Sequence, residues 1–126
     1  MPTHYHYLLK IKNATIFPKK ISYLFNKYMK SLNTIRNEKG QYFRNRFKAK
    51  LIDDEIYLIQ LCYYIHLNPL KSAIVKSLDD WPFSNYLEFI GKRNGKLIDQ
   101  EFYREYIQSA KNYLEVIKTV KFNKDI

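Results

Sequence analysis

The feature that most constrains this chain is an apolar helical run predicted over residues 54–68, which Pro69 ends. Most of its side chains are Ile, Leu or aromatic, but Gln60, Tyr64 and Asn68 recur at intervals of four. Residues four apart share one face of an α-helix, so this spacing predicts a stripe carrying one phenol and two carboxamides. The stripe is either the polar end of an aromatic core helix or the chemical part of a site, and Gln60 either contacts substrate or only extends the stripe.

The N-terminal stretch contains a second feature of chemical interest, the pair His4 and His6. Residues 4–11 alternate in a way that predicts a strand, which places both imidazoles on the same side of it. Two imidazoles at this spacing can chelate a divalent cation, and imidazole suits Mn and Zn better than Mg. Two incidental histidines are the alternative. A third ligand could be the carbonyl oxygen of Asn68, which would place Tyr64 beside the ion.

Charge is distributed unevenly along the chain, which has a formal net charge of +10. Residues 1–50 hold 12 Lys and Arg and one acid, for a net of +11, while residues 51–126 hold 10 Lys and Arg and 11 acids, for a net of −1. This asymmetry favours a polyanion as partner, with nucleic acid first and an acidic membrane surface second. A solvated basic face without a partner is the alternative.

Two elements are predicted in the basic half. Residues 18–36 follow a 3.6-residue period behind Pro18 and predict an amphipathic helix. Residues 42–52 alternate instead and predict a half-buried strand with a cationic outer face, interleaved with aromatic rings. The candidate DNA contacts on it are Arg44, Arg46, Lys48 and Lys50. An edge strand that Lys and Arg protect from aggregation is the alternative.

The remaining chain predicts further helices in a single domain. Asp53 or Asp54 is expected to cap the central helix, Ser84 a short helix that ends at Gly91, and Asp99 a last helix of about twenty residues. Apolar residues make up 46% of the chain, which is enough for one modest core. The single cysteine, Cys62, excludes a disulfide within one chain and reads as a buried thiol. No signal peptide or membrane span is recognisable, so the cytoplasm is the expected compartment.

A tyrosine hydroxyl beside a bound cation suggests one kind of chemistry. It becomes a useful nucleophile only if its proton is removed or its target is strongly polarised. A metal ion on a scissile phosphate polarises the target. The residues therefore fit attack by Tyr64 on a phosphodiester, with the basic half holding the nucleic acid. Tyr63 is the less favoured nucleophile because it points about 100° away, and His66 is expected to be packed or exposed outside the metal site.

Four short stretches together carry a resemblance to a known family. They are Met1-Pro2-Thr3-His4-Tyr5-His6-Tyr7-Leu8-Leu9, Gly40-Gln41-Tyr42-Phe43-Arg44-Asn45-Arg46-Phe47-Lys48, Tyr64-Ile65-His66-Leu67-Asn68-Pro69-Leu70-Lys71 and Trp81-Pro82-Phe83-Ser84-Asn85-Tyr86. They resemble, in order, the His-hydrophobe-His strand, the Gly-x-x-Phe-x-x-Arg-Phe-Lys segment, the Tyr-Ile-x-x-Asn-Pro-Val signature and the Trp-x-x-Ser-Ser-Tyr box of the HUH-type single-tyrosine transposases. Within that group the REP-associated tyrosine transposases are the most similar branch.

The resemblance implies an α+β fold, with helices packed on the faces of a central antiparallel, ferredoxin-like sheet that holds both histidines on a middle strand. It implies that Tyr64 forms a 5′-phosphotyrosine and releases a 3′-hydroxyl, with Mg or Mn held by His4, His6 and Asn68. The implied substrate is single-stranded DNA next to small hairpins. Residues 1–91 match the family core, and residues 92–126 add a C-terminal helix and tail.

One departure from the family affects the expected activity. Family members usually carry several tens of residues before the histidine strand, so this chain is expected to lack the first strand and helix. We expect it to need that segment in trans or a homodimer partner. The alternatives are a catalytically dead, truncated remnant that binds single-stranded nucleic acid, and a basic RNA-binding or toxin-like protein.

Overall fold

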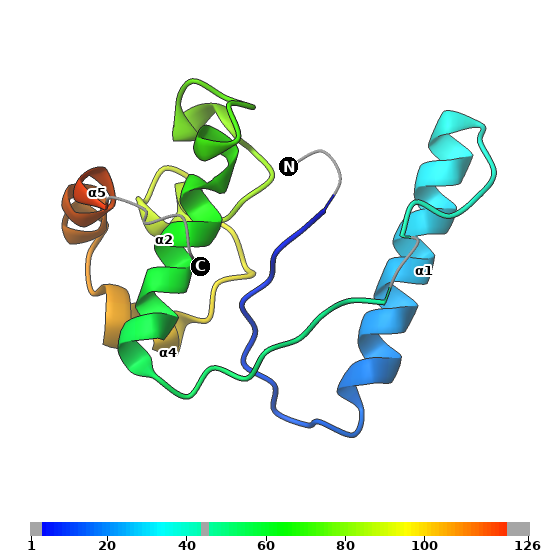
Figure 1. Cartoon of the computed structure of the whole chain (residues 1–126), viewed down its shortest axis with the longest axis horizontal. Coiled ribbons are helices and arrows are strands. Elements are labelled where there is room, and N and C mark those ends of the chain that lie inside the picture. The colour runs from blue at the N-terminus through cyan, green and yellow to red at the C-terminus, as the bar shows by residue number, and fades with distance from the viewer. Residues whose placement is uncertain (1–3, 44–45, 121–126) are drawn as a thin grey trace. The chain divides into compact units, whose positions relative to one another are not determined.

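The computed structural model describes residues 4–43 and 46–120. The chain divides into two compact units, unit 1 (Met1–Leu8 and Ile52–Ile126) and unit 2 (Leu9–Leu51). In chain order the elements are α1 (Phe17–Arg36), α2 (Glu55–Lys71), η1 (Leu78–Asp80), α3 (Tyr86–Phe89), α4 (Gln100–Phe102), η2 (Tyr103–Ile107) and α5 (Ala110–Thr119), of which Figure 1 labels four.

The predicted antiparallel sheet is wrong. All regular elements within residues 4–43 and 46–120 are helical, and the stretches predicted as strands, 4–11 and 42–52, run without strand pairing where they are described (Figure 1). An alternating sequence pattern indicates only which side chains lie on the same side of an extended chain. A sheet also needs a neighbouring strand that takes up the backbone N–H and C=O groups. No described segment provides one, so the α+β, ferredoxin-like fold and the histidine-bearing middle strand are both corrected.

Helix α2 forms as predicted, but it begins one residue later and ends three residues later than expected. The Asp54 side chain accepts a hydrogen bond from the Tyr57 N–H at 2.6 Å, which confirms an aspartate cap. Pro69 lies inside the last turn instead of ending the helix. It removes one backbone donor, but the Ser72 N–H still donates to the Asn68 carbonyl at 2.9 Å and closes the turn.

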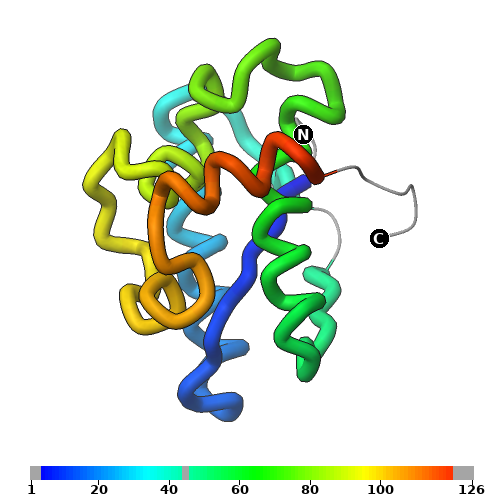
Figure 2. Tube along the Cα trace, turned by 90° about the vertical axis from the view of Figure 1, so that its left-hand side faces the viewer, coloured from blue at the N-terminus to red at the C-terminus, as the bar shows by residue number. Residues whose placement is uncertain are grey.

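The core of unit 1 is aromatic and lies between α2, α3, η2 and α5. Its buried members are Tyr86, Phe89, Ile90, Ile107, Tyr113 and Ile117. The Tyr113 side chain is 1% exposed and its ring stacks on Tyr63 of α2, with ring centroids 4.9 Å apart. Helix α5 accordingly lies beside α2 (Figure 2). Aromatic pairs of this kind dominate the burial of apolar area in a small core.

The predicted twenty-residue last helix is interrupted in the structure. Asp99 caps α4 as expected, because its carboxylate accepts hydrogen bonds from the Glu101 and Phe102 N–H groups. The chain then forms the π-helical turn η2 and breaks at Gln108, where φ is 66°. Ser109 starts α5 by accepting a hydrogen bond from the Asn112 N–H at 3.1 Å. A serine that caps a helix competes with continuation of the preceding one, which explains the break.

Unit 2 consists of α1 and the segments that flank it. Helix α1 matches the predicted helix to within one residue, and Asn13 Oδ1 accepts hydrogen bonds from the Thr15 and Ile16 N–H groups before it. Asn37 ends the helix in the left-handed conformation, with φ at 51°. No residue of α1 is buried. The ring centroids of Phe25 and Phe43 lie 5.0 Å apart, so aromatic contacts join α1 to the segment that follows it.

Cys62 is buried on α2, as predicted from the sequence. Burial raises the pKa of its thiol to about 12, which keeps it protonated and poorly reactive in the folded chain. Among the described residues, no helix is both long and apolar enough to cross a membrane.

Candidate active site

Unit 1 brings the N-terminal histidines to the predicted nucleophile on α2. The imidazole of His6 meets the Tyr64 ring edge-on, with ring centroids 5.7 Å apart, and the His4 ring lies 5.1 Å from that of His6. These three side chains come from the first and the third of the four sequence stretches. Their clustering does not depend on a sheet, because a short non-helical segment of unit 1 carries both histidines.

The imidazole of His6 has an unused nitrogen. It is half-buried, and within the described part of the chain its buried Nε2 has no hydrogen-bond partner. Burial lowers the pKa of His6 because it disfavours the charged form, and repulsion from His4 lowers the pKa further. A neutral imidazole with a free nitrogen is the form that binds a divalent cation.

Asn68 lies one turn beyond Tyr64 on α2 and is buried. Its Oδ1 accepts a hydrogen bond from Ser72 Oγ at 3.3 Å, and an amide oxygen keeps a second lone pair for another partner. Among residues 4–43 and 46–120, no three His, Cys, Asp or Glu side chains gather into a group that could hold a metal ion. A three-ligand site built on the described histidines would therefore need a different donor, such as this amide oxygen.

Lys71 is a neighbour of Tyr64 that the sequence analysis did not assign to the site. Its Nζ lies 5.9 Å from the centroid of the Tyr64 ring. The two residues are seven apart on α2, close to two full helical turns, and that spacing is the signal that could have identified the pair. An ammonium group here would attract a negatively charged phosphate to the neighbourhood of the phenol.

The predicted DNA contacts divide between the two units. Gln60 is exposed on α2 in unit 1, whereas Arg46, Lys48 and Lys50 are exposed on the non-helical segment of unit 2. Arg44 lies outside the described residues. Because this segment is not a strand, the alternation of its residues does not place the cations on one face of a sheet.

His66 lies outside the site and inside the core, in agreement with the interpretation that it is packed. It is 3% exposed, with Nδ1 2.7 Å from Tyr113 Oη and Nε2 2.8 Å from Asn85 Oδ1. Burial lowers its pKa to about 4, although the hydrogen bond to Asn85 opposes the shift. Residue spacing could not identify these two partners, because Tyr113 and Asn85 lie 47 and 19 residues along the chain from His66.

Comparison with known proteins gives one informative similarity. The chain is 27% identical over 96 residues to a protein of Haemophilus influenzae that is named as a REP-associated tyrosine transposase. The match covers 68% of this chain and about half, 54%, of that relative. No family model matches the chain. No solved structure matches it either.

This similarity agrees with the resemblance found in the four sequence stretches.

Proposed function

We propose that this protein is a single-stranded DNA transposase and endonuclease of the HUH type, which cuts and rejoins DNA through a 5′-phosphotyrosine on Tyr64. The contact between His6 and Tyr64 carries the proposal, because it places a neutral imidazole with an unused nitrogen against a half-buried phenol. The similarity to a named tyrosine transposase supports the same chemistry.

The proposed reaction begins with attack of the Tyr64 oxygen on a backbone phosphorus atom. The phenol gives up its proton, a bond forms between its oxygen and phosphorus, and the bond from phosphorus to the 3′-oxygen breaks. The departing 3′-oxygen takes up a proton and leaves as a hydroxyl. Rejoining reverses these steps with the 3′-hydroxyl of another strand, so no external energy source is required.

In this proposal His4, His6 and Asn68 would hold a divalent metal ion, Mg or Mn. The donor set fits such an ion, since it includes an imidazole nitrogen that lacks a hydrogen-bond partner and an amide oxygen with a spare lone pair. Imidazole ligands favour Mn over Mg. When bound, the ion would polarise the scissile phosphate.

The strand would be held by the basic residues of unit 2 and by α2. The proposed contacts are Arg44, Arg46, Lys48, Lys50 and Gln60, to which the structure adds Lys71. The proposed substrate is a hairpin-forming single strand, and the proposed compartment is the cytoplasm. A homodimer partner completes the proposal, because residues 4–8 form no regular helix or strand where they are described.

That same observation favours a second candidate function, a binding remnant without catalysis. His4 is exposed and belongs to a segment without strand pairing in the described chain. Catalytic geometry has to hold to within about 0.5 Å, and such a segment gives less support than a sheet would. A protein of this kind would bind single-stranded DNA and form no covalent bond with it.

The deciding experiment mixes the purified chain with a labelled single-stranded hairpin DNA and Mn, followed by a denaturing gel. We expect a covalent protein–DNA band that disappears in Tyr64→Phe, in His6→Ala and with a chelator. The matched control is Tyr63→Phe, which removes the neighbouring hydroxyl and should keep the band. Retarded migration on a native gel without any covalent band would establish the binding remnant instead.

A further inference from the structure

Unit 1 has a depression of about 470 Å³ at which three lysines meet, away from the residues of the candidate active site. Lys76 follows α2, Lys92 follows α3, and Lys118 lies in the last turn of α5. Asp79 also lines the depression and forms an ion pair with Lys92. Lys76 and Lys118 are exposed, and neither has a hydrogen bond or ion pair within the described part of the chain.

This concentration of positive charge stands out against its surroundings. Residues 51–126 have a net charge of −1, yet the depression is lined by three lysines and one aspartate. Three amines from three separate segments converge there only because the chain folds. The arrangement therefore gives this surface a local excess of positive charge in the half of the sequence that lacks a basic excess.

The floor of the same depression is apolar. Leu70, Leu78 and Leu114 line it, and Leu70 is 39% exposed there. A simple anion makes no use of such a floor. A nucleotide of single-stranded DNA uses both parts, since it has a phosphate on either side and presents an apolar sugar face and base face between them.

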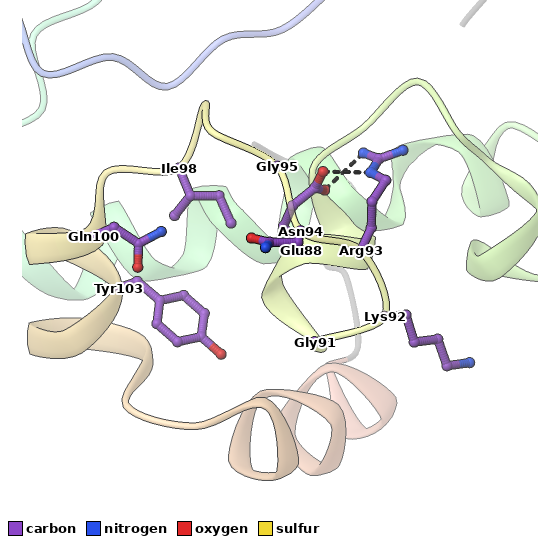
Figure 3. A pocket seen from close by; sticks show the side chains of 9 residues that line it. All are labelled: Glu88, Gly91, Lys92, Arg93, Asn94, Gly95, Ile98, Gln100 and Tyr103. Carbon is purple, nitrogen blue, oxygen red and sulfur yellow. Dashed lines mark hydrogen bonds and ion pairs between the residues drawn. The ribbon is translucent and has the colours of Figure 1, made fainter.

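A second depression of unit 1 is of similar volume, about 450 Å³, but its groups are already used by the fold (Figure 3). Arg93 donates hydrogen bonds to the Glu88 carboxylate and to the carbonyl oxygens of Pro82 and Ser84. Tyr103 Oη donates to the Phe89 carbonyl at 2.8 Å. The guanidinium and the hydroxyl that face this depression hold its loop in place, which distinguishes it from the lysine-lined one.

We propose that the lysine-lined depression binds one nucleotide of single-stranded DNA, with the flanking phosphates on Lys76 and Lys118 and the sugar and base against Leu70, Leu78 and Leu114. The inference rests on the proposed DNA substrate but not on cleavage. Tyr64 and Leu70 are six residues apart on α2, or about 9 Å along the helix axis. A strand at Tyr64 therefore reaches the depression within a few nucleotides.

The test measures binding of the full chain to labelled oligothymidine by fluorescence anisotropy, with chelator present and Tyr64→Phe in every protein so that no cleavage occurs. Each phosphate contact to a single strand contributes about 0.7 to the slope of log affinity against log salt. For Lys76→Ala/Lys118→Ala we expect that slope to fall by about 1.4. Between 50 and 200 mM salt the parent should lose about sevenfold more affinity than this variant.

The matched control is Lys96→Ala/Lys111→Ala, which removes one loop lysine and one α5 lysine that are exposed but do not line the depression. We expect it to keep the parent slope. Circular dichroism and thermal melting should show all variants folded. An unchanged slope in the Lys76/Lys118 variant, or an equal fall in the control, overturns the inference.

A second arm tests the apolar floor. Leu70→Ser should weaken oligothymidine binding without changing the salt slope, because the lost contact carries no charge. Inorganic polyphosphate should compete more weakly per phosphate than oligothymidine, and equal competition would overturn the nucleotide assignment in favour of a plain anion site. If the parent binds DNA as expected but the wild-type protein forms no covalent band, the proposed cleavage is wrong, while the proposal that the depression binds a nucleotide is retained.

Discussion

The two units of this protein use apolar side chains in opposite ways. In unit 1 the ring of Tyr113 is 1% exposed and lies against residues from two other elements, Tyr63 of α2 and Phe89 of α3. In unit 2 no residue of α1 is buried: Tyr23 is 66% exposed and Ile35 84% exposed, while Ile21, Phe25 and Leu32 are half-buried. Amphipathic periodicity therefore predicts a helix in both units, but within the described part of unit 2 no second helix packs on the apolar side of α1.

This difference indicates that most of the free energy of unfolding comes from unit 1. Burial of apolar area and satisfied buried hydrogen bonds both concentrate in unit 1, where His66, Tyr113 and Asn85 form a closed polar network inside the core. Unit 2 has local helix caps and a few ring contacts. Equivalent changes made in both units should therefore have unequal effects.

The largest contrast is expected from one substitution made in each unit. Tyr113→Ala should lower the free energy of unfolding by about 3–5 kcal/mol, because it leaves a cavity and deprives His66 of its partner. Tyr23→Ala should change it by no more than about 0.5 kcal/mol, since that ring is exposed. Urea unfolding followed by circular dichroism measures both. Equal losses would show that the two units share one cooperative core.

Acid should act on unit 1 next most strongly. All three histidines belong to unit 1, and the folded pKa of His66, about 4, lies below the ordinary value of 6.5. As pH falls, the unfolded chain therefore binds a proton on His66 before the folded chain does. The contribution of neutral His66 to the free energy of unfolding is complete above pH 6.5 and is lost as pH falls towards 4. The full loss is about 3 kcal/mol.

The measurement for this prediction is urea unfolding at several pH values between 7 and 5, which is above the range where carboxylates titrate. His66→Gln should remove most of the decline and leave the part that comes from His6, whose pKa burial also lowers. A decline of full size in His66→Gln would assign the pH dependence to other groups.

The helix caps give a smaller and more local comparison. Asp54→Ala should lower the free energy of unfolding of unit 1 by about 1 kcal/mol, because the Tyr57 N–H loses its acceptor. Asn13→Ala removes the matching acceptor before α1 and should reduce helix content in unit 2 alone. Amide hydrogen exchange resolved by residue separates the two effects. Loss of protection in α5 of the Asn13 variant would contradict the separation.

The smallest effect is expected at the most exposed apolar position of α1. Ile35→Gln should leave the free energy of unfolding within about 0.5 kcal/mol of wild type, because little apolar area is buried there. Thermal melting at two protein concentrations checks this. A larger loss that grows with concentration would show that another copy of the chain covers this side chain.

Sequence reasoning located the long helices and their caps well. The 3.6-residue period and Pro18 gave α1 to within one residue, and an aspartate was correctly expected before α2. It failed where a local pattern needs a distant partner. The alternation of residues 4–11 and 42–52 predicted strands, but alternation does not supply the neighbouring chain that a sheet requires. The predicted last helix also continued through Ser109, whereas in the structure the Ser109 side chain caps α5 and competes with continuation of the preceding helix.

The candidate site was predictable in composition and less so in its surroundings. Spacing on α2 places Tyr64 and Asn68 one turn apart, and the structure brings the His6 ring to Tyr64, while the roles of these residues stay a prediction. The lysine-lined depression was not predictable, because Lys76, Lys92 and Lys118 come from three segments that share no period. Contacts between distant segments depend on tertiary packing, which no spacing rule encodes.

The buried thiol of Cys62 can be used to measure how often α2 separates from the core. It is the single cysteine and is 5% exposed, on the helix that carries Tyr64. A thiol-alkylating reagent can reach its sulfur only in molecules whose α2 has separated from the core. The rate of labelling then measures how often that helix leaves its neighbours, and a DNA strand that binds along α2 should slow the labelling in proportion to its occupancy.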